Sequence, residues 1–135
     1  MEPKVQVAQE TARRGPAPDR WQVRWRVENL GDRQLKILAA RLPHGKFRSA
    51  ETEFARAILI EPKQSGRIEL EVRCNEPPGS IVENAFLIMR VLCADAPWLI
   101  LARLRVSVND KRAPVTAAEL ITAQPVGFST KPEES

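Results

Sequence analysis

The chain has 135 residues, of which 43% are hydrophobic and 28% are charged, and its formal net charge is +4. This is the balance of an ordinary globular domain and excludes a largely disordered chain. No apolar run reaches the length of a membrane-spanning helix, and the N-terminus lacks the apolar segment of a signal peptide, so we expect a soluble, cytoplasmic protein.

The first third of the chain predicts three strands. Alternating valines within residues 3–9 indicate a short edge strand. Residues 20–30 alternate along their whole length, and the apolar side chains on one face are Trp21, Val23, Trp25 and Val27. A turn at residues 29–32 leads into a third strand over residues 34–42. Because the tryptophans share a face with valines, we assign them to the core rather than to a ligand-stacking surface.

The middle of the chain holds one ambiguous segment and one clear strand. Residues 53–60 fit a short helix about as well as a strand, although the Ile-Leu-Ile run just before Glu61 and Pro62 favours a strand. Residues 67–74 alternate strictly, and their apolar members are Ile68, Leu70, Val72 and Cys74. The sequence Asn-Glu-Pro-Pro-Gly at residues 75–79 ends this strand.

Residues 83–109 are the most hydrophobic stretch and predict a hairpin of two long strands. The first run, residues 86–93, is apolar at nearly every position, as in a strand covered on both faces. The second run, residues 98–108, alternates with a period of two. Asp95, Ala96 and Pro97 mark a turn between them, so the two strands should be antiparallel.

The pattern changes after Asn109. Thr116 and Glu119 have the spacing of a capping box, which predicts a short helix over residues 117–124. We therefore divide the chain into a sandwich domain (residues 1–109), a C-terminal segment that packs on the sandwich or on a partner (residues 110–128), and a disordered end (residues 129–135).

About seven strands separated by turn signals predict an all-β fold, an immunoglobulin-like antiparallel β-sandwich with a short helical or extended tail. The strand that begins at Trp21, the turn Asn29-Leu30-Gly31, the turn from Pro62 to Ser65 and the later Pro-Pro-Gly follow one another in a recognisable order. Over residues 21–108 this order resembles the major-sperm-protein and ASH-type domains and related bacterial immunoglobulin-like modules. The resemblance implies a non-enzymatic binding or scaffolding module without shared catalytic residues. The basic phosphopeptide-binding motif of some members is not seen.

The sequence contains no catalytic or cofactor-binding motif, so we expect no enzyme activity, no cofactor and no small-molecule substrate. Cys74, Cys93 and His44 are too few for a zinc site, which takes about four ligands, and we expect no metal. In a reducing compartment the two cysteines are expected to be buried thiols, although a disulfide between them stays open.

One predicted surface is apolar and calls for a protein partner. If Leu87, Met89 and Val91 face the core, their neighbours in the hairpin face outward, and some apolar patch survives in the opposite phase as well. The predicted contact face consists of Leu38, Phe86, Ile88, Leu92, Leu99 and Leu101. Soluble monomers seldom expose such a patch, so we expect a protein partner or self-association.

The C-terminal segment offers apolar side chains that could cover part of this face. These are Val115, Leu120, Ile121, Val126 and Phe128. We expect them to lie over the face, with association using what they leave exposed.

A second hypothesis is a binder of nucleic acid or of an anionic surface through Arg24, Arg26, Arg103 and Arg105. We expect nucleic acid to be the less favoured partner for two reasons. Arg24 and Arg26 point away from the tryptophans, whereas a nucleic-acid surface interleaves the two kinds of side chain. If the strand pairs with residues 67–74, these arginines would also lie beside Glu69 and Glu71.

Overall fold

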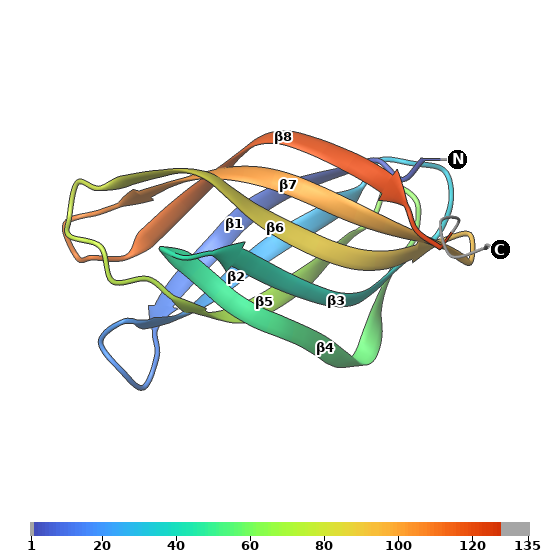
Figure 1. Cartoon of the computed structure of the whole chain (residues 1–135). Helices are drawn as coiled ribbons and strands as arrows, with labels where there is room; N and C mark the ends of the chain where they lie inside the picture. Colours follow the sequence, from blue (N-terminus) through green and yellow to red (C-terminus); the bar gives the residue numbers. More distant parts are fainter. Residues whose placement is uncertain (1, 128–135) are drawn as a thin grey trace, which may run out of the picture.

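Strands and turns account for residues 2–127, the part of the chain that the computed structural model describes, and no residue in this range is helical (Figure 1). There are eight strands: β1 (Val5–Arg14), β2 (Arg20–Asn29), β3 (Leu35–His44), β4 (Phe47–Ile60), β5 (Ser65–Arg73), β6 (Ile81–Cys93), β7 (Ala96–Val108) and β8 (Pro114–Pro125). The predicted all-β fold is confirmed, but the number of strands is eight rather than seven. No membrane-crossing helix occurs in the described range.

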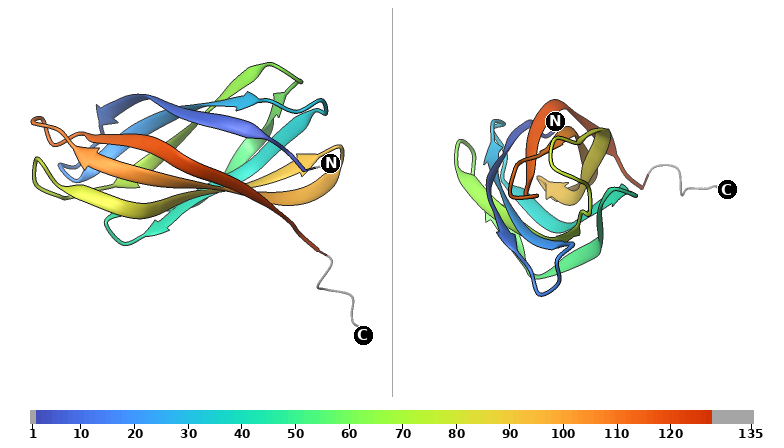
Figure 2. Two further views of the ribbon diagram at one scale, coloured as in Figure 1. Left: turned by 90° about the horizontal axis from the view of Figure 1, so that it is seen from above. Right: turned by 90° about the vertical axis from the view of Figure 1, so that its left-hand side faces the viewer.

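The strands form one antiparallel sheet in the order β1-β2-β5-β4-β3-β6-β7-β8. The sheet curls around its core, and in the end-on view of Figure 2 it makes a nearly closed, barrel-like ring. Two junctions of this ring are weak. Strands β4 and β5 share a single bridge, between Arg48 and Arg73, and the ladder pairings include none between β1 and β8. These junctions divide the ring into a three-strand half (β1, β2, β5) and a five-strand half (β4, β3, β6, β7, β8).

Side chains replace the missing ladder where β1 meets β8. Gln9 donates from Nε2 to the carbonyl oxygen of Pro114 (3.0 Å), and its Oε1 accepts from the backbone N–H (2.8 Å) and the hydroxyl (2.7 Å) of Thr116. The same hydroxyl oxygen accepts a hydrogen bond from Nε1 of the fully buried Trp25 (3.0 Å). One carboxamide and one hydroxyl therefore close the ring and satisfy a buried indole N–H.

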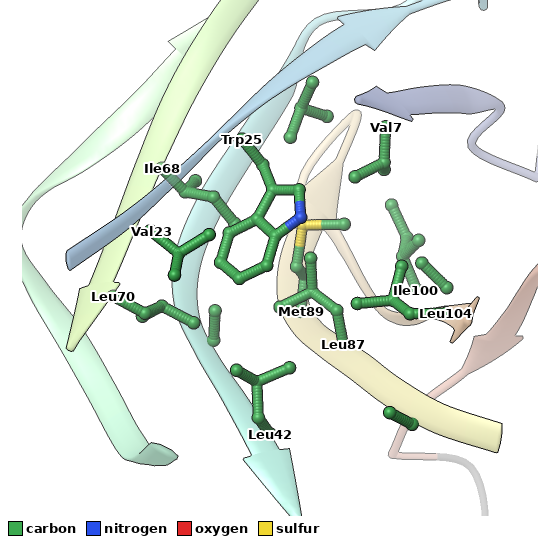
Figure 3. Packing of buried hydrophobic residues seen from close by; sticks show 14 of the residues in the cluster. Val7, Val23, Trp25, Leu42, Ile68, Leu70, Leu87, Met89, Ile100 and Leu104 are labelled. Carbon is green, nitrogen blue, oxygen red and sulfur yellow. The ribbon is translucent and has the colours of Figure 1, made fainter. Parts of the chain in front are cut away.

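The core is built from the alternate positions that the sequence indicates. Trp21, Val23, Trp25 and Val27 are all buried, and so are Ile68, Leu70 and Val72 on the neighbouring strand β5. Figure 3 shows Trp25 among side chains from both halves of the ring, including Leu87, Met89 and Ile100. The indole ring meets the ring of Phe47 edge-on, with centroids 6.3 Å apart. Both halves of the ring thus contribute to one continuous core.

The expected C-terminal helix is wrong, because residues Pro114–Pro125 form strand β8 paired with β7. The capping-box spacing lies in a segment that alternates buried and exposed positions at its start, and Thr116 uses its hydroxyl for Gln9 and Trp25 instead of a helix N-terminus. A sheet edge and a buried indole thus outweigh the local helical preference of Ala117 and Ala118. The expected disordered end, residues 129–135, lies outside the described residues.

The ambiguous segment at residues 53–60 is a strand, part of the 14-residue β4. It carries a large irregularity: Ala39 pairs with Glu53 and Ile37 with Ile58, so four residues of β4 oppose one residue of β3. Partly buried Phe54 and Ile58 pack against the core from this segment. This distortion accounts for the mixed periodicity of the sequence.

The hairpin of β6 and β7 has the predicted antiparallel arrangement, with Cys93 paired to Ala96. The turn residues are Ala94 and Asp95, one position earlier than expected, and both have positive φ angles (50° and 67°). This is the geometry of a type I′ turn, which suits the twist of the two strands.

Candidate protein-contact face

The six residues of the predicted contact face all lie on the outside of the five-strand half. Leu87, Met89 and Val91 are buried, so the phase that places their neighbours outward is the one adopted. Across the β6–β7 ladder, Ile88 stands opposite Leu101, and Arg90 stands opposite Leu99. The six outward side chains (Leu38, Phe86, Ile88, Leu92, Leu99 and Leu101) are each half-buried.

Further exposed apolar side chains extend this surface. Leu59 on β4 (56% exposed) stands opposite Lys36, and Leu120 on β8 (51%) stands opposite Arg103. At the far end of the same surface, Ile81 (51%) and Val115 (46%) both stand opposite Ser107. We call the outside of the five-strand half the apolar face; its central members are the six residues above with Leu59 and Leu120.

Leu59 and Ile81 were not predicted as part of this surface. Leu59 lies in the segment whose structure the sequence left open, and Ile81 lies before the stretch assigned to the hairpin. The run Ile58-Leu59-Ile60 is apolar at every position, so its sequence carries no alternation that could show which side chain faces outward.

The C-terminal segment does not cover the apolar face, contrary to expectation. It extends the sheet beside β7, so its outward side chains enlarge the face instead of sheltering it. Val115 and Leu120 are exposed, and so is Val126. Of the five apolar side chains expected to cover the face, Ile121 packs partly against the core instead, and Phe128 lies outside the described residues.

The three arginines that β6 and β7 place on the apolar face are paired within the chain. Arg90 binds Glu51 (2.7 Å) and Glu53 (3.2 Å), and these carboxylates raise the pKa of its guanidinium. Arg105 lies 3.0 Å from Glu83, and Arg103 lies 4.0 Å from Glu119. These pairs are exposed, so each contributes little to folding, on the order of 0–1 kcal/mol. They leave a surface without a strong excess of either charge.

The outside of the three-strand half is charged instead. Arg24 lies opposite Glu69 and binds it (3.2 Å), as predicted. Arg26 does not stand beside a carboxylate, because the register places it opposite Arg67. The two arginine pairs of the nucleic-acid hypothesis lie on different halves of the ring, Arg24 and Arg26 on β2 and the other pair on β7. The structure therefore does not gather the four arginines into one surface.

The two cysteines are buried at the ends of their strands. Cys74 is a free thiol, so no disulfide joins it to Cys93. Burial raises the pKa of both thiols. Among residues 2–127 no cluster of three or more His, Cys, Asp or Glu side chains is placed to hold a metal ion. His44 lies in the β3–β4 turn, where its Nδ1 accepts a hydrogen bond from the backbone N–H of Lys46 (3.0 Å).

Comparison with known proteins adds no relative to this description. No protein-family model matches the chain, and no curated protein sequence is significantly similar to it.

Proposed function

We propose that the chain is a non-enzymatic protein-interaction module with an immunoglobulin-like fold. The strand order supports this fold. If the first seven strands are lettered A to G, the order reads A-B-E-D-C-F-G, in which A-B-E-D and C-F-G are the two sheets of a constant-type immunoglobulin domain. Here D pairs along its length with C and through one bridge with E. Strand β8 would then be an addition beside G.

The observation that carries the functional proposal is the contrast between the two outer surfaces. Every exposed large apolar side chain that lies in a strand of the described chain, namely Leu59, Ile81, Val115 and Leu120, belongs to the five-strand half. The outside of the three-strand half carries arginines and glutamates at the corresponding positions. The outside of the three-strand half is therefore suited to contact with solvent, and the outside of the five-strand half to contact with another protein surface.

The occupant we propose is a second copy of this chain. The three arginines of β6 and β7 on the apolar face are already paired within one copy, and Lys36 and Arg41 are the unpaired cations among its apolar side chains in the described part of the chain. A face whose charges are mostly matched can pack against itself about a two-fold axis. A two-fold dimer covers the eight central side chains of each copy, sixteen in all, and each contributes roughly 0.5–1 kcal/mol because it is already partly buried. Association costs about 4–15 kcal/mol in lost freedom, so the expected dimer is weak, with a Kd in the micromolar-to-millimolar range.

Sedimentation velocity over a wide concentration range tests this proposal. We expect the sedimentation coefficient of the wild-type chain to rise with concentration, and the Leu101→Lys and Ile88→Lys variants to stay monomeric because each buries an unpaired ammonium in the interface. Leu30→Lys is the matched control, since Leu30 is exposed (37%) in the turn after β2 and away from the apolar face.

Two results would contradict the proposal: a wild-type chain that stays monomeric at all concentrations, or variants of the apolar face that associate like the wild type. Point substitutions are preferable to deleting the C-terminal segment, because that deletion removes β8 and the Thr116 hydroxyl that Trp25 needs.

The free buried thiol of Cys74 supports a reducing compartment, and we propose the cytoplasm as the place of action.

A further inference from the structure

Three arginines line up across the weak junction between the two halves of the ring. In the strand register Arg20 on β2 stands opposite Arg73 on β5, and Arg73 stands opposite Arg48 on β4. Residues directly opposite each other point to the same face, so the three guanidinium groups project from one side of the sheet. Like charges directly opposite each other destabilise the pairing of two strands, and the register holds two such pairs in succession. The pair of Arg48 and Arg73 is the only bridge between β4 and β5.

The arginines border a cavity of about 270 Å³ where β4 and β5 separate. Ser49 and Thr52 also line it, from the β4 side. The hydroxyl of exposed Thr52 makes only a long hydrogen bond, at 3.5 Å to the carbonyl oxygen of Ala50, so it is available as a donor to a ligand. Ser49 is buried in phase with Phe47 and faces the core. Glu71 is the one carboxylate of the lining.

The positive charge in this cavity is only partly compensated. Asp19 binds Nε of Arg73 (3.2 Å) from outside the lining, and Glu71 lies 3.9 Å from Arg20, beyond hydrogen-bond distance. Nε of Arg20 is buried without a hydrogen-bond partner, and Oδ1 of Asp19 lies 3.9 Å from it. The side chain of Arg48 makes no ion pair or hydrogen bond with any of residues 2–127. Three cations against two carboxylates leave one positive charge uncompensated, which a further anion would balance.

We propose that this cavity binds a phosphate monoester. Such a group carries about two negative charges and three terminal oxygens, and guanidinium groups bind it through paired N–H donors. Arginines from three strands and the Thr52 hydroxyl offer donors on several sides of one point, which suits a tetrahedral group better than a planar carboxylate with two oxygens. The site lies on the edge of β4 that faces β5, whereas the apolar face continues from the other edge of β4 through β3.

Titration calorimetry of the full chain with inorganic phosphate and with O-phosphoserine, at constant ionic strength, tests this site. We expect saturable binding of both probes by the wild type. Arg48→Gln should weaken binding about tenfold or more, the effect of losing one charge-assisted hydrogen bond. Glu71→Gln should strengthen binding, because it removes the only carboxylate of the lining. Arg56→Gln, which removes an exposed arginine of the same strand outside the cavity, should change nothing.

Arg48→Gln also separates binding from folding. The substitution removes a like-charged neighbour of Arg73 and breaks no ion pair, so the variant should unfold at the wild-type temperature or above. The proposal is overturned if the wild type does not bind either probe, or if Arg48→Gln and Arg56→Gln weaken binding equally. It is also overturned if a single-stranded oligonucleotide, a phosphodiester, binds through Arg48 more tightly than the monoesters.

Discussion

Replacing Thr116 by valine tests whether the side-chain closure between β1 and β8 stabilises the ring. Valine has nearly the shape of threonine but cannot accept a hydrogen bond, so the fully buried Nε1–H of Trp25 loses its partner. An unsatisfied buried donor costs about 1–3 kcal/mol. Gln9 keeps the backbone N–H of residue 116 and loses only the hydroxyl, at about 0.5–1.5 kcal/mol.

The free energy of unfolding should therefore fall by about 2–4 kcal/mol, which lowers Tm by roughly 10 °C for a chain of this length. Urea denaturation followed by tryptophan fluorescence measures the change, and Thr122→Val is the matched control because Thr122 is exposed on the same strand. In a Trp25→Phe background, which has no indole N–H, Thr116→Val should cost less than in the wild type. An equal cost in both backgrounds would refute the assignment of this stability to the Trp25–Thr116 bond.

Three further substitutions or conditions have expected outcomes. Gly66→Ala should destabilise the chain by about 1–3 kcal/mol in urea denaturation, because the added methyl group lies 2.9 Å from two side-chain carbons of buried Ile60, whereas Gly45→Ala meets nothing within 4 Å and should be nearly neutral. Ala94→Gly should raise the free energy of unfolding by about 1 kcal/mol, since φ is 50° there and an unchanged value would contradict the strained turn. The free energy of unfolding should fall as pH rises above 9.0, the ordinary pKa of a thiol. The thiols of the unfolded chain ionise there, whereas buried Cys74 and Cys93, whose pKa values are raised, stay protonated. The chain has no tyrosine to obscure this slope, and a variant with both cysteines replaced by alanine should lack it.

The sequence predicts the structure best for strands that have one buried face and one solvent-exposed face. Strands β2 and β5 fulfil this condition, and their alternation alone assigns Trp21, Trp25, Ile68 and Leu70 to the core, as the structure confirms. The outward phase of Ile88 and its neighbours needed the structure, because a strand that is apolar on both faces carries no period.

The C-terminal segment shows why local patterns fail at a sheet edge. Thr116, two alanines and Glu119 are compatible with a helix start, and nothing near them in the sequence reveals that Trp25, 91 positions away, requires the hydroxyl. The strand then forms because β7 offers a free edge, and that edge exists only after the hairpin has folded.

The arginine cavity could not be found from the sequence for a different reason. Arg20, Arg48 and Arg73 are unremarkable alternating positions on three separate strands. They become neighbours only through the pairing of β2 with β5 and the single bridge from β5 to β4. The site arises from the register between strands that are not consecutive in the sequence, and that register is fixed only when the whole sheet has formed.

The contact between Gln9 and Thr116 has a consequence for how the molecule opens. Elsewhere neighbouring strands are joined by main-chain ladders, except at the single bridge between β4 and β5, but here the two ends of the sheet meet through a carboxamide and a hydroxyl. Parting β1 from β8 breaks these side-chain hydrogen bonds, whereas parting most other neighbouring strands breaks a main-chain ladder. We therefore expect the ring to open first by a parting of β1 from β8 that leaves the main-chain ladders intact. Amides that point into the gap should then exchange with solvent ahead of the rest of the sheet.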